Sequence, residues 1–104
     1  MSTLRTYHPM RKISDKAREK QAARAACIRD VRKRAGYRCE ARIHGVCTGA
    51  AEHTHEKVMR SAGGSITDPD NCLAVCSACH RFIHENREFA AKEGFIQSRY
   101  EGRN

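Results

Sequence analysis

The chain has 104 residues and carries 20 lysines and arginines against 12 acidic residues, which gives a formal net charge of +8. Only 39% of the residues are hydrophobic and tryptophan is absent, so a chain of this length can bury only a thin core. It has no run of about 18 apolar residues, as a membrane span would need, and residues 1–10 lack the apolar stretch of a secretory signal. We therefore expect one small cytoplasmic domain that something besides hydrophobic burial holds together.

The positive charge is concentrated at the N-terminal end. Residues 1–38 hold 12 basic and 3 acidic side chains, a net charge of +9, whereas residues 39–104 have a net charge of −1. After a loose start, the pattern predicts a helix from about Asp15 to Ala35, with Ser14 as its N-cap and Gly36 as its stop. This helix is either a solvated element packed by a narrow apolar stripe or a helix that contacts phosphates.

The middle of the chain reads as a hairpin. Residues 51–59 could form a strand, and residues 61–65 are a glycine-rich loop. The sequence Asp-Pro-Asp at 68–70 is a turn signal, and residues 73–75 make a brief second strand.

A second helix is expected to run from Ser77 to about Lys92, with Gly94 as its stop. Phe95, Ile96 and Tyr100 in the tail are available to pack back on the domain. We thus predict an α+β fold with a basic N-terminal arm and helix (1–36), a core domain (37–94) and a C-terminal tail (95–104).

The six cysteines suggest a metal staple. Cys76 and Cys79 form a C-x-x-C pair, and Cys39 and Cys47 form a wider pair upstream. Two such pairs commonly meet at one tetrahedral Zn²⁺, whose binding adds folding free energy. A redox role for the C-x-x-C pair is a weaker interpretation, because no thioredoxin-like βαβ pattern surrounds it. Cys27 and Cys72 stay outside this scheme and read as small apolar residues.

The histidines suggest a second metal site. His80 and His84 are four residues apart on the second predicted helix, so their rings project from one face. The hairpin can fold back to bring His55 beside them. Three histidines on one divalent ion would leave positions open for water and a phosphate oxygen. His53 shares the strand face of His55; we expect an exposed strand histidine there, the alternatives being an extra ligand or a stand-in base.

Two stretches together resemble a known family. They read A-E-H-T-H-E-K-V-M-R-S-A-G-G and D-P-D-N-C-L-A-V-C-S-A-C-H-R-F-I-H. His80 and His84 follow Asn71 by nine and thirteen positions, and the pair His55-Glu56 precedes it by sixteen and fifteen. This pattern is similar to that of the HNH endonucleases of the ββα-metal fold, more narrowly the small phage-type members with a four-cysteine zinc knuckle.

The resemblance implies a role for each matching residue. His55, His80 and His84 would hold a catalytic divalent ion (Mg²⁺, Mn²⁺, Ni²⁺ or Zn²⁺), and Asn71 would brace the site and orient the general base. The structural Zn²⁺ ligands would be Cys39, Cys47, Cys76 and Cys79.

Glu56 departs from the family pattern, which has histidine, the general base, at this position. A carboxylate with a pKa near ~4.3 is a weaker base than an imidazole near ~6.5. Three interpretations stay open: Glu56 is a functional base, it is an added metal ligand, or it marks an inactivated site.

The expected activity is metal-dependent hydrolysis of DNA phosphodiester bonds with low intrinsic sequence specificity. The side chains expected to contact DNA are Arg29, Arg32, Lys33, Arg34, Arg60 and Arg81. The resemblance implies double-stranded DNA as the partner, terminase or portal components of a phage as possible further partners, and a monomer or weak dimer. The alternatives are a non-catalytic, zinc-stapled DNA-binding accessory module with a degenerate site and a toxin-like nuclease that acts on RNA.

Overall fold

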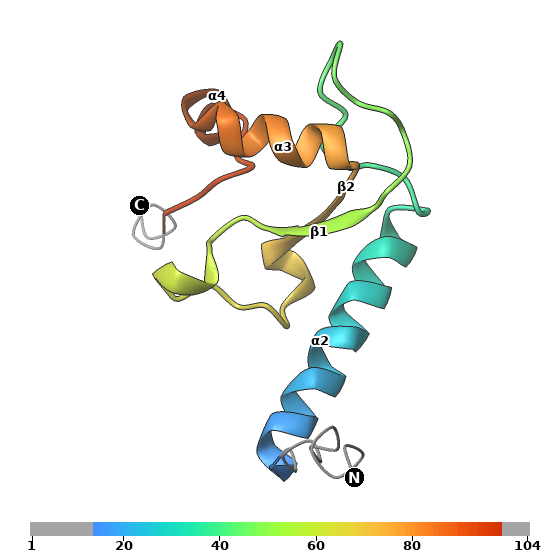
Figure 1. Ribbon diagram of the computed structural model, residues 1–104, viewed down its shortest axis with the longest axis vertical. Coiled ribbons are helices and arrows are strands. Elements are labelled where there is room, and N and C mark those ends of the chain that lie inside the picture. The colour runs from blue at the N-terminus through green and yellow to red at the C-terminus, as the bar shows by residue number, and fades with distance from the viewer. Residues whose placement is uncertain (1–13, 99–104) are drawn as a thin grey trace, which may run out of the picture.

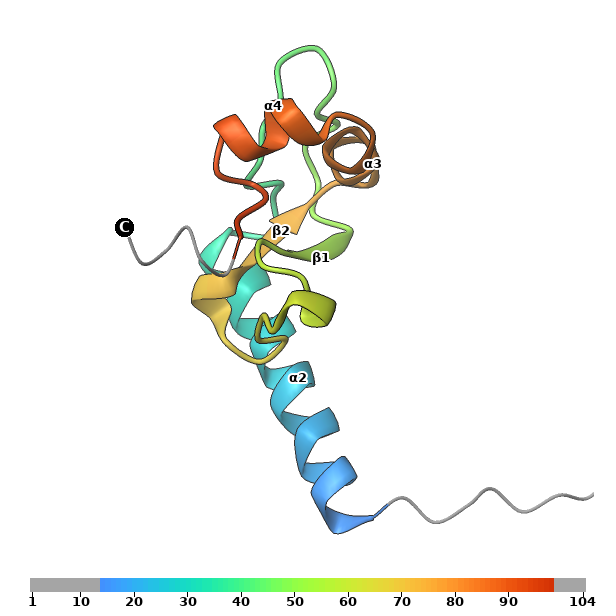
Figure 2. The ribbon, with the colours of Figure 1, turned by 90° about the vertical axis from the view of Figure 1, so that its left-hand side faces the viewer.

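A computed structural model describes residues 14–98. The long helix α2 (Asp15–Arg34) precedes the strands β1 (His53–Glu56) and β2 (Cys72–Val75), and the helices α3 (Ser77–Glu85) and α4 (Arg87–Lys92) follow. Short 3₁₀ turns at Arg60–Ala62 and Pro69–Asn71 lie between the strands. The two strands lie between α2 on one side and α3 and α4 on the other (Figures 1 and 2). This is the predicted α+β class, with a two-stranded antiparallel sheet. The part of the chain that the structure describes holds no helix long and apolar enough to span a membrane.

The helix α2 starts where the sequence predicts. The Ser14 hydroxyl accepts a hydrogen bond from the Ala17 backbone N–H at 3.1 Å, which caps the first turn. Asp15 lies in the first turn, and three basic residues lie in the last turn, so both ends complement the helix dipole. The helix ends at Arg34, and the left-handed Gly36 (φ 64°) turns the chain away. The predicted loose start, residues 1–13, lies outside the described residues.

The first strand is shorter than the sequence suggests. The register of the two strands determines which side chains lie on each face of the sheet. His53 pairs with Val75 and His55 pairs with Leu73, so these four side chains share the face toward α3. Glu56 pairs with Cys72, and this alternate set faces α2. Only residues 53–56 of the predicted 51–59 strand pair in the sheet, because the chain then bends into the glycine-rich loop.

Each face of the sheet has its own small core. On the α2 side, the buried residues are Cys27, Val31, Cys72 and Ala74. Cys27 and Cys72 bring their Sγ atoms to 3.8 Å, so the two cysteines outside the expected zinc group serve as apolar packing residues. On the α3 side, the buried residues are Cys39, Ala41, Ile43, Val75, Cys76, Cys79, Ile83 and Ala90.

The predicted helix over 77–92 is in fact two helices. Asn86 leaves the helical conformation (φ −129°, ψ 66°) and separates α3 from α4. Its side-chain amide donates to the Phe82 carbonyl at 3.0 Å, a local bond that competes with helix continuation. The bend allows the Phe89 ring to meet Phe82 edge to face, with ring centroids 5.4 Å apart.

The tail returns to the core. After Gly94 (φ 80°), the Phe95 and Ile96 side chains pack on the α3-side core, as the sequence predicts. The Gln97 N–H donates to the Lys57 carbonyl at 2.8 Å and so ties the tail to the end of β1. Tyr100, also expected to pack back, lies outside the described residues.

An ion pair at the C-terminal end of α2 joins this helix to the rest of the domain. Arg34 donates to both oxygens of Glu40 at 2.6 and 3.0 Å, and its Nη atoms also donate to the Pro69 and Cys72 carbonyls. Glu40 in turn accepts from the Ala74 N–H at 2.9 Å. Burial by itself would raise the Glu40 pKa, but the hydrogen bonds from Arg34 and Ala74 outweigh it and the pKa is lowered.

We expect Arg34→Gln to lower the free energy of unfolding by about 2 kcal/mol, since it removes charged hydrogen bonds to three partners. Because the folded Glu40 pKa is depressed, the stabilisation from this pair is present above the unfolded value of 4.5 and is lost as the pH falls through the folded pKa. Urea unfolding followed by circular dichroism at pH 7 and pH 3.5 measures both effects. Lys33→Gln removes the same charge from the neighbouring exposed position; equal stability of the two variants would contradict the assignment.

Candidate metal centres

The structure brings the four predicted zinc cysteines together. Cys39 and Cys47 come from the segment after α2, and Cys76 and Cys79 come from the start of α3. Their Sγ atoms all lie within 4.8 Å of one another. Four thiolates at ~2.3 Å from one tetrahedral ion would stand about 3.8 Å apart, so this group has the size of a Zn²⁺ site.

Backbone N–H groups around Cys76 stabilise its thiolate form. The Thr48 and Cys79 N–H groups donate to its Sγ atom at 3.4 and 3.3 Å. Burial acts to raise the pKa of Cys76, but these bonds outweigh it and lower the pKa to about 6. Burial raises the pKa of Cys79 and of Cys47, so a bound cation is what would bring these two thiols to the thiolate form. The donor set and its hydrogen bonds fit a closed structural zinc site.

The second predicted group is also assembled. His55 comes from β1, and His80 and His84 come from the face of α3 above it. One ring nitrogen from each lies within 4.8 Å of the others. The Nε2 atoms of His80 and His84 are 3.2 Å apart, close to the ~3.4 Å that separates two nitrogens bound tetrahedrally to one ion at ~2.1 Å. The spacing fits two ligands of one metal.

Burial favours the neutral form of two rings of this group, those of His55 and His80. His55 is only 3% exposed, and its pKa is lowered mainly by burial. Burial and the neighbouring imidazoles His55, His84 and His53 lower the pKa of His80 to about 4. Neutral imidazoles carry the lone pair that binds Zn²⁺, Ni²⁺ or related ions, so the residues present fit a divalent metal.

The tail sets the tautomer of His55. Its Nε2 atom lies 2.6 Å from the Phe95 carbonyl oxygen. A carbonyl only accepts, so Nε2 carries the hydrogen and Nδ1 is the nitrogen left to bind a metal. Metal-bound histidines usually donate their other N–H to such a partner.

Asn71 holds the loop that follows β1. Its Oδ1 accepts from the Val58 N–H at 3.0 Å, and its Nδ2 donates to the Val58 and Ser65 carbonyls at 3.0 and 2.8 Å. Gly64 lies so close to the Val58 carbonyl that any side chain would collide with it. The glycine-rich loop is thereby fixed against the strand end, the bracing expected of Asn71.

Glu56 points away from the histidines. On the α2 side of β1, its Oε2 accepts from the Arg24 Nη2 at 2.9 Å, and Arg24 also donates to the Ile66 carbonyl at 2.6 Å. Alternate strand residues face opposite ways, which is why Glu56 lies outside the group of possible ligands that contains His55. The structure therefore gives no support to Glu56 as an added metal ligand. The two remaining interpretations are that Glu56 is the general base or that it marks an inactivated site.

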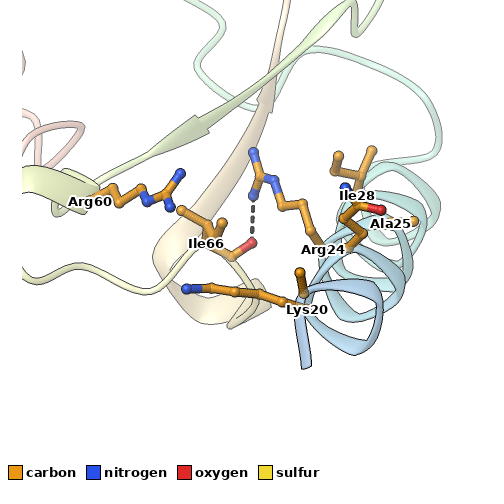
Figure 3. A pocket seen from close by; sticks show the side chains of 8 residues that line it. Lys20, Arg24, Ala25, Ile28, Arg60 and Ile66 are labelled. Atoms are coloured by element: carbon orange, nitrogen blue, oxygen red, sulfur yellow. Dashed lines mark hydrogen bonds between the residues drawn. The ribbon is translucent and has the colours of Figure 1, made fainter. Parts of the chain in front are cut away.

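A basic groove lies beside this ion pair. The α2 groove, a cavity of about 460 Å³, has Lys20, Arg24 and Ile28 of α2 on one side and Arg60 and Ile66 on the other (Figure 3). Among the described residues, no acidic side chain lines it, and the ion pairs are Arg24–Glu56 and Arg34–Glu40. Within residues 14–98, Lys20 and Arg60 therefore present charges without an acidic partner.

The residues expected to contact DNA divide into two kinds. Arg34 is held by Glu40, and Arg32 donates to the Glu52 carbonyl at 3.2 Å, so both already make bonds within the chain. The side chains of Arg29, Lys33, Arg60 and Arg81 are exposed. A DNA contact by any of the six stays a prediction.

Two neighbours of the sites, the Phe95 carbonyl and Arg24, escape sequence reasoning. The Phe95 carbonyl is a backbone group and leaves no signal in the sequence. Arg24 is one of many arginines on α2, and nothing in the spacing connects it to Glu56. His53, which the sequence places on the His55 face, is exposed, as expected, and its Nδ1 lies 2.9 Å from the Nδ1 of His80.

Comparison of the chain with protein-family models, curated proteins and solved structures finds no match to any of the three. The HNH resemblance therefore stays a prediction that depends on the residues of this chain alone.

We expect the purified protein to hold one zinc per chain after mild chelation, and Cys76→Ser to lose both the zinc and cooperative thermal unfolding. Elemental analysis and circular dichroism measure the two properties. Cys27→Ala, which changes a buried thiol of the other core, is the matched control and keeps its zinc. Retention of zinc by Cys76→Ser would contradict the four-thiolate site.

Proposed function

We propose that this protein is a metal-dependent DNA endonuclease of the HNH type with a structural zinc. The observation that supports it best is the convergence of His55, His80 and His84 on one centre between a β-hairpin and the following helix. Two strands followed by a helix that carries the ligands is the arrangement that the resemblance implies. The cytoplasm, a bacterial host's if the chain is phage-encoded, is the expected location.

The chain's residues take the following roles in this proposal. His55, His80 and His84 hold a divalent ion, which when bound supplies positive charge to a phosphate oxygen. Glu56 would accept the proton of the attacking water only after leaving its ion pair with Arg24 on the α2 side of β1. Asn71 keeps the strand end and the following loop in register. The products would be a 5′-phosphate and a 3′-hydroxyl end, as in the family.

DNA as the substrate is supported by the distribution of charge. The N-terminal third carries the whole positive excess, and Lys20, Arg24 and Arg60 gather around the α2 groove. Such cations bind phosphates without reading sequence, so a partner, for example a phage terminase or portal component, would supply specificity.

The ion pair of Glu56 with Arg24 favours a second candidate, a zinc-stapled DNA-binding module without catalysis. A carboxylate held by Arg24 on the far side of β1 is occupied rather than poised over the histidines. The two candidates differ in whether the parent protein cleaves DNA.

We expect the zinc-loaded protein to convert supercoiled plasmid to nicked or linear DNA when Mg²⁺, Mn²⁺ or Ni²⁺ is added. His80→Ala should abolish cleavage, because it removes a ligand, and Glu56→Gln should slow it by about a hundredfold, the usual contribution of a general base. Gel electrophoresis of timed reactions gives the rates.

His44→Ala and Glu88→Gln change exposed residues of the same types and serve as controls that keep the parent rate. No cleavage by the parent with any of the three metals, together with cleavage by Glu56→His, would instead establish an inactivated site and the second candidate.

The α2 groove gives a separate prediction for binding. We expect Lys20→Gln combined with Arg60→Gln to weaken binding to all DNA sequences alike and to reduce the slope of log K against log salt by about 0.9 for each lost phosphate contact. Fluorescence anisotropy at several salt concentrations measures both. Arg29→Gln with Lys33→Gln removes the same charge from another face of α2, beside Asp30 and Tyr37. A larger slope change in this second pair would place the DNA on that face instead.

A further inference from the structure

The ring nitrogens of the histidine group form a chain of contacts that extends beyond the three possible ligands. The Nε2 atom of His55 is in hydrogen-bond contact with the Phe95 carbonyl oxygen, which lies outside the histidine group. His80 has a comparable neighbour: its Nδ1 lies 2.9 Å from the Nδ1 of His53, and the two ring centroids are 5.0 Å apart at 73°. His53 is thus in hydrogen-bond contact with a possible ligand without itself belonging to the ligand group.

The two nitrogens of His80 have different tasks. Its Nε2 stands 3.2 Å from the Nε2 of His84, the separation expected of two nitrogens on one ion. Nε2 must then present its lone pair to the metal, so the ring hydrogen of neutral His80 is on Nδ1. The Nδ1 of His53 lies 2.9 Å from this nitrogen. It accepts the hydrogen when His53 is in the tautomer that carries its own hydrogen on Nε2.

We propose that His53 is a positioning residue for the metal ligand His80: by accepting the Nδ1–H it fixes the tautomer and the ring orientation that direct the His80 Nε2 at the metal. This inference rests on the metal site of the proposed function and goes beyond it by adding a fourth histidine with a distinct task.

The fold explains why this contact forms. His53 and His55 are two residues apart on β1, so both face α3. His53 pairs with Val75, the residue just before Cys76 and the start of α3, and therefore lies under the first turns of that helix, where His80 projects. His55, two residues further along β1, has ring centroids 5.3 and 5.6 Å from those of His80 and His84.

Neither of the two nearby carboxylates, Glu52 and Glu56, accepts a hydrogen bond from the His80 ring. Glu52 directly precedes His53, but its Oε1 accepts from the Ser77 backbone N–H at 3.0 Å, at the first residue of α3. Glu56 is held by Arg24 on the other face of the sheet. Within residues 14–98, the acceptor in contact with the His80 Nδ1 is the imidazole of His53.

The test is calorimetric titration of the zinc-loaded protein with Ni²⁺. We expect His53→Ala to weaken Ni²⁺ binding by about tenfold or more, the usual effect of removing such a partner. His53→Asn should restore most of the affinity, because the Asn Oδ1 can stand where the His Nδ1 was. His44→Ala, an exposed histidine outside the group, should bind Ni²⁺ like the parent, and zinc content verifies that each variant is folded.

Nickel X-ray absorption separates the remaining outcomes. The proposal expects the same three imidazoles on nickel in the parent and in His53→Ala. A fourth imidazole that disappears in His53→Ala would overturn it, since His53 would then be a ligand. Unchanged Ni²⁺ affinity in His53→Ala would also overturn it and leave the metal site intact. If the parent bound no Ni²⁺ beyond its zinc, the metal site itself would fail, and this inference with it.

Discussion

A sheet of two strands with four residues each is not stable alone in water, and this fold depends on covering both faces of that sheet. The strand period of two gives each face its own task. One face of β1 presents His53 and His55 to α3, and the other presents Glu56 to α2. The histidine group and the basic helix α2 are therefore kept on opposite sides of a single extended strand.

Much of this arrangement can be predicted from the sequence because it depends on local signals. The Ser14 cap, the cysteine spacings and the four-residue separation of His80 and His84 are patterns within a single element or pair of elements. The structure confirms that the cysteines gather into one group and the three histidines into another. Once the hairpin is assumed, the periodicities of the helix and the strand predict that His55, His80 and His84 share one site.

The sequence does not predict contacts between residues whose type and spacing give no sign that they meet. The break at Asn86 arises from a side-chain bond that competes with the helix, although the residues on both sides favour helix. The Arg24–Glu56 pair joins residues 32 positions apart, and any of several arginines on α2 would look equally suitable. The support of His55 comes from a backbone carbonyl of the tail, and every residue has one.

The two candidate metal centres are not independent, because α3 carries both. Cys76 caps the helix through the Cys79 N–H, and Cys79 lies in the thiol group while the next residue, His80, lies in the histidine group. Neighbouring residues on a helix point about 100° apart, so one helix can serve two centres on different sides. In a chain with so thin a core, a zinc bound by the thiols would fix the start and the rotation of α3. It would thereby also set the direction in which His80 and His84 face His55. The zinc site would in this way orient the proposed catalytic site.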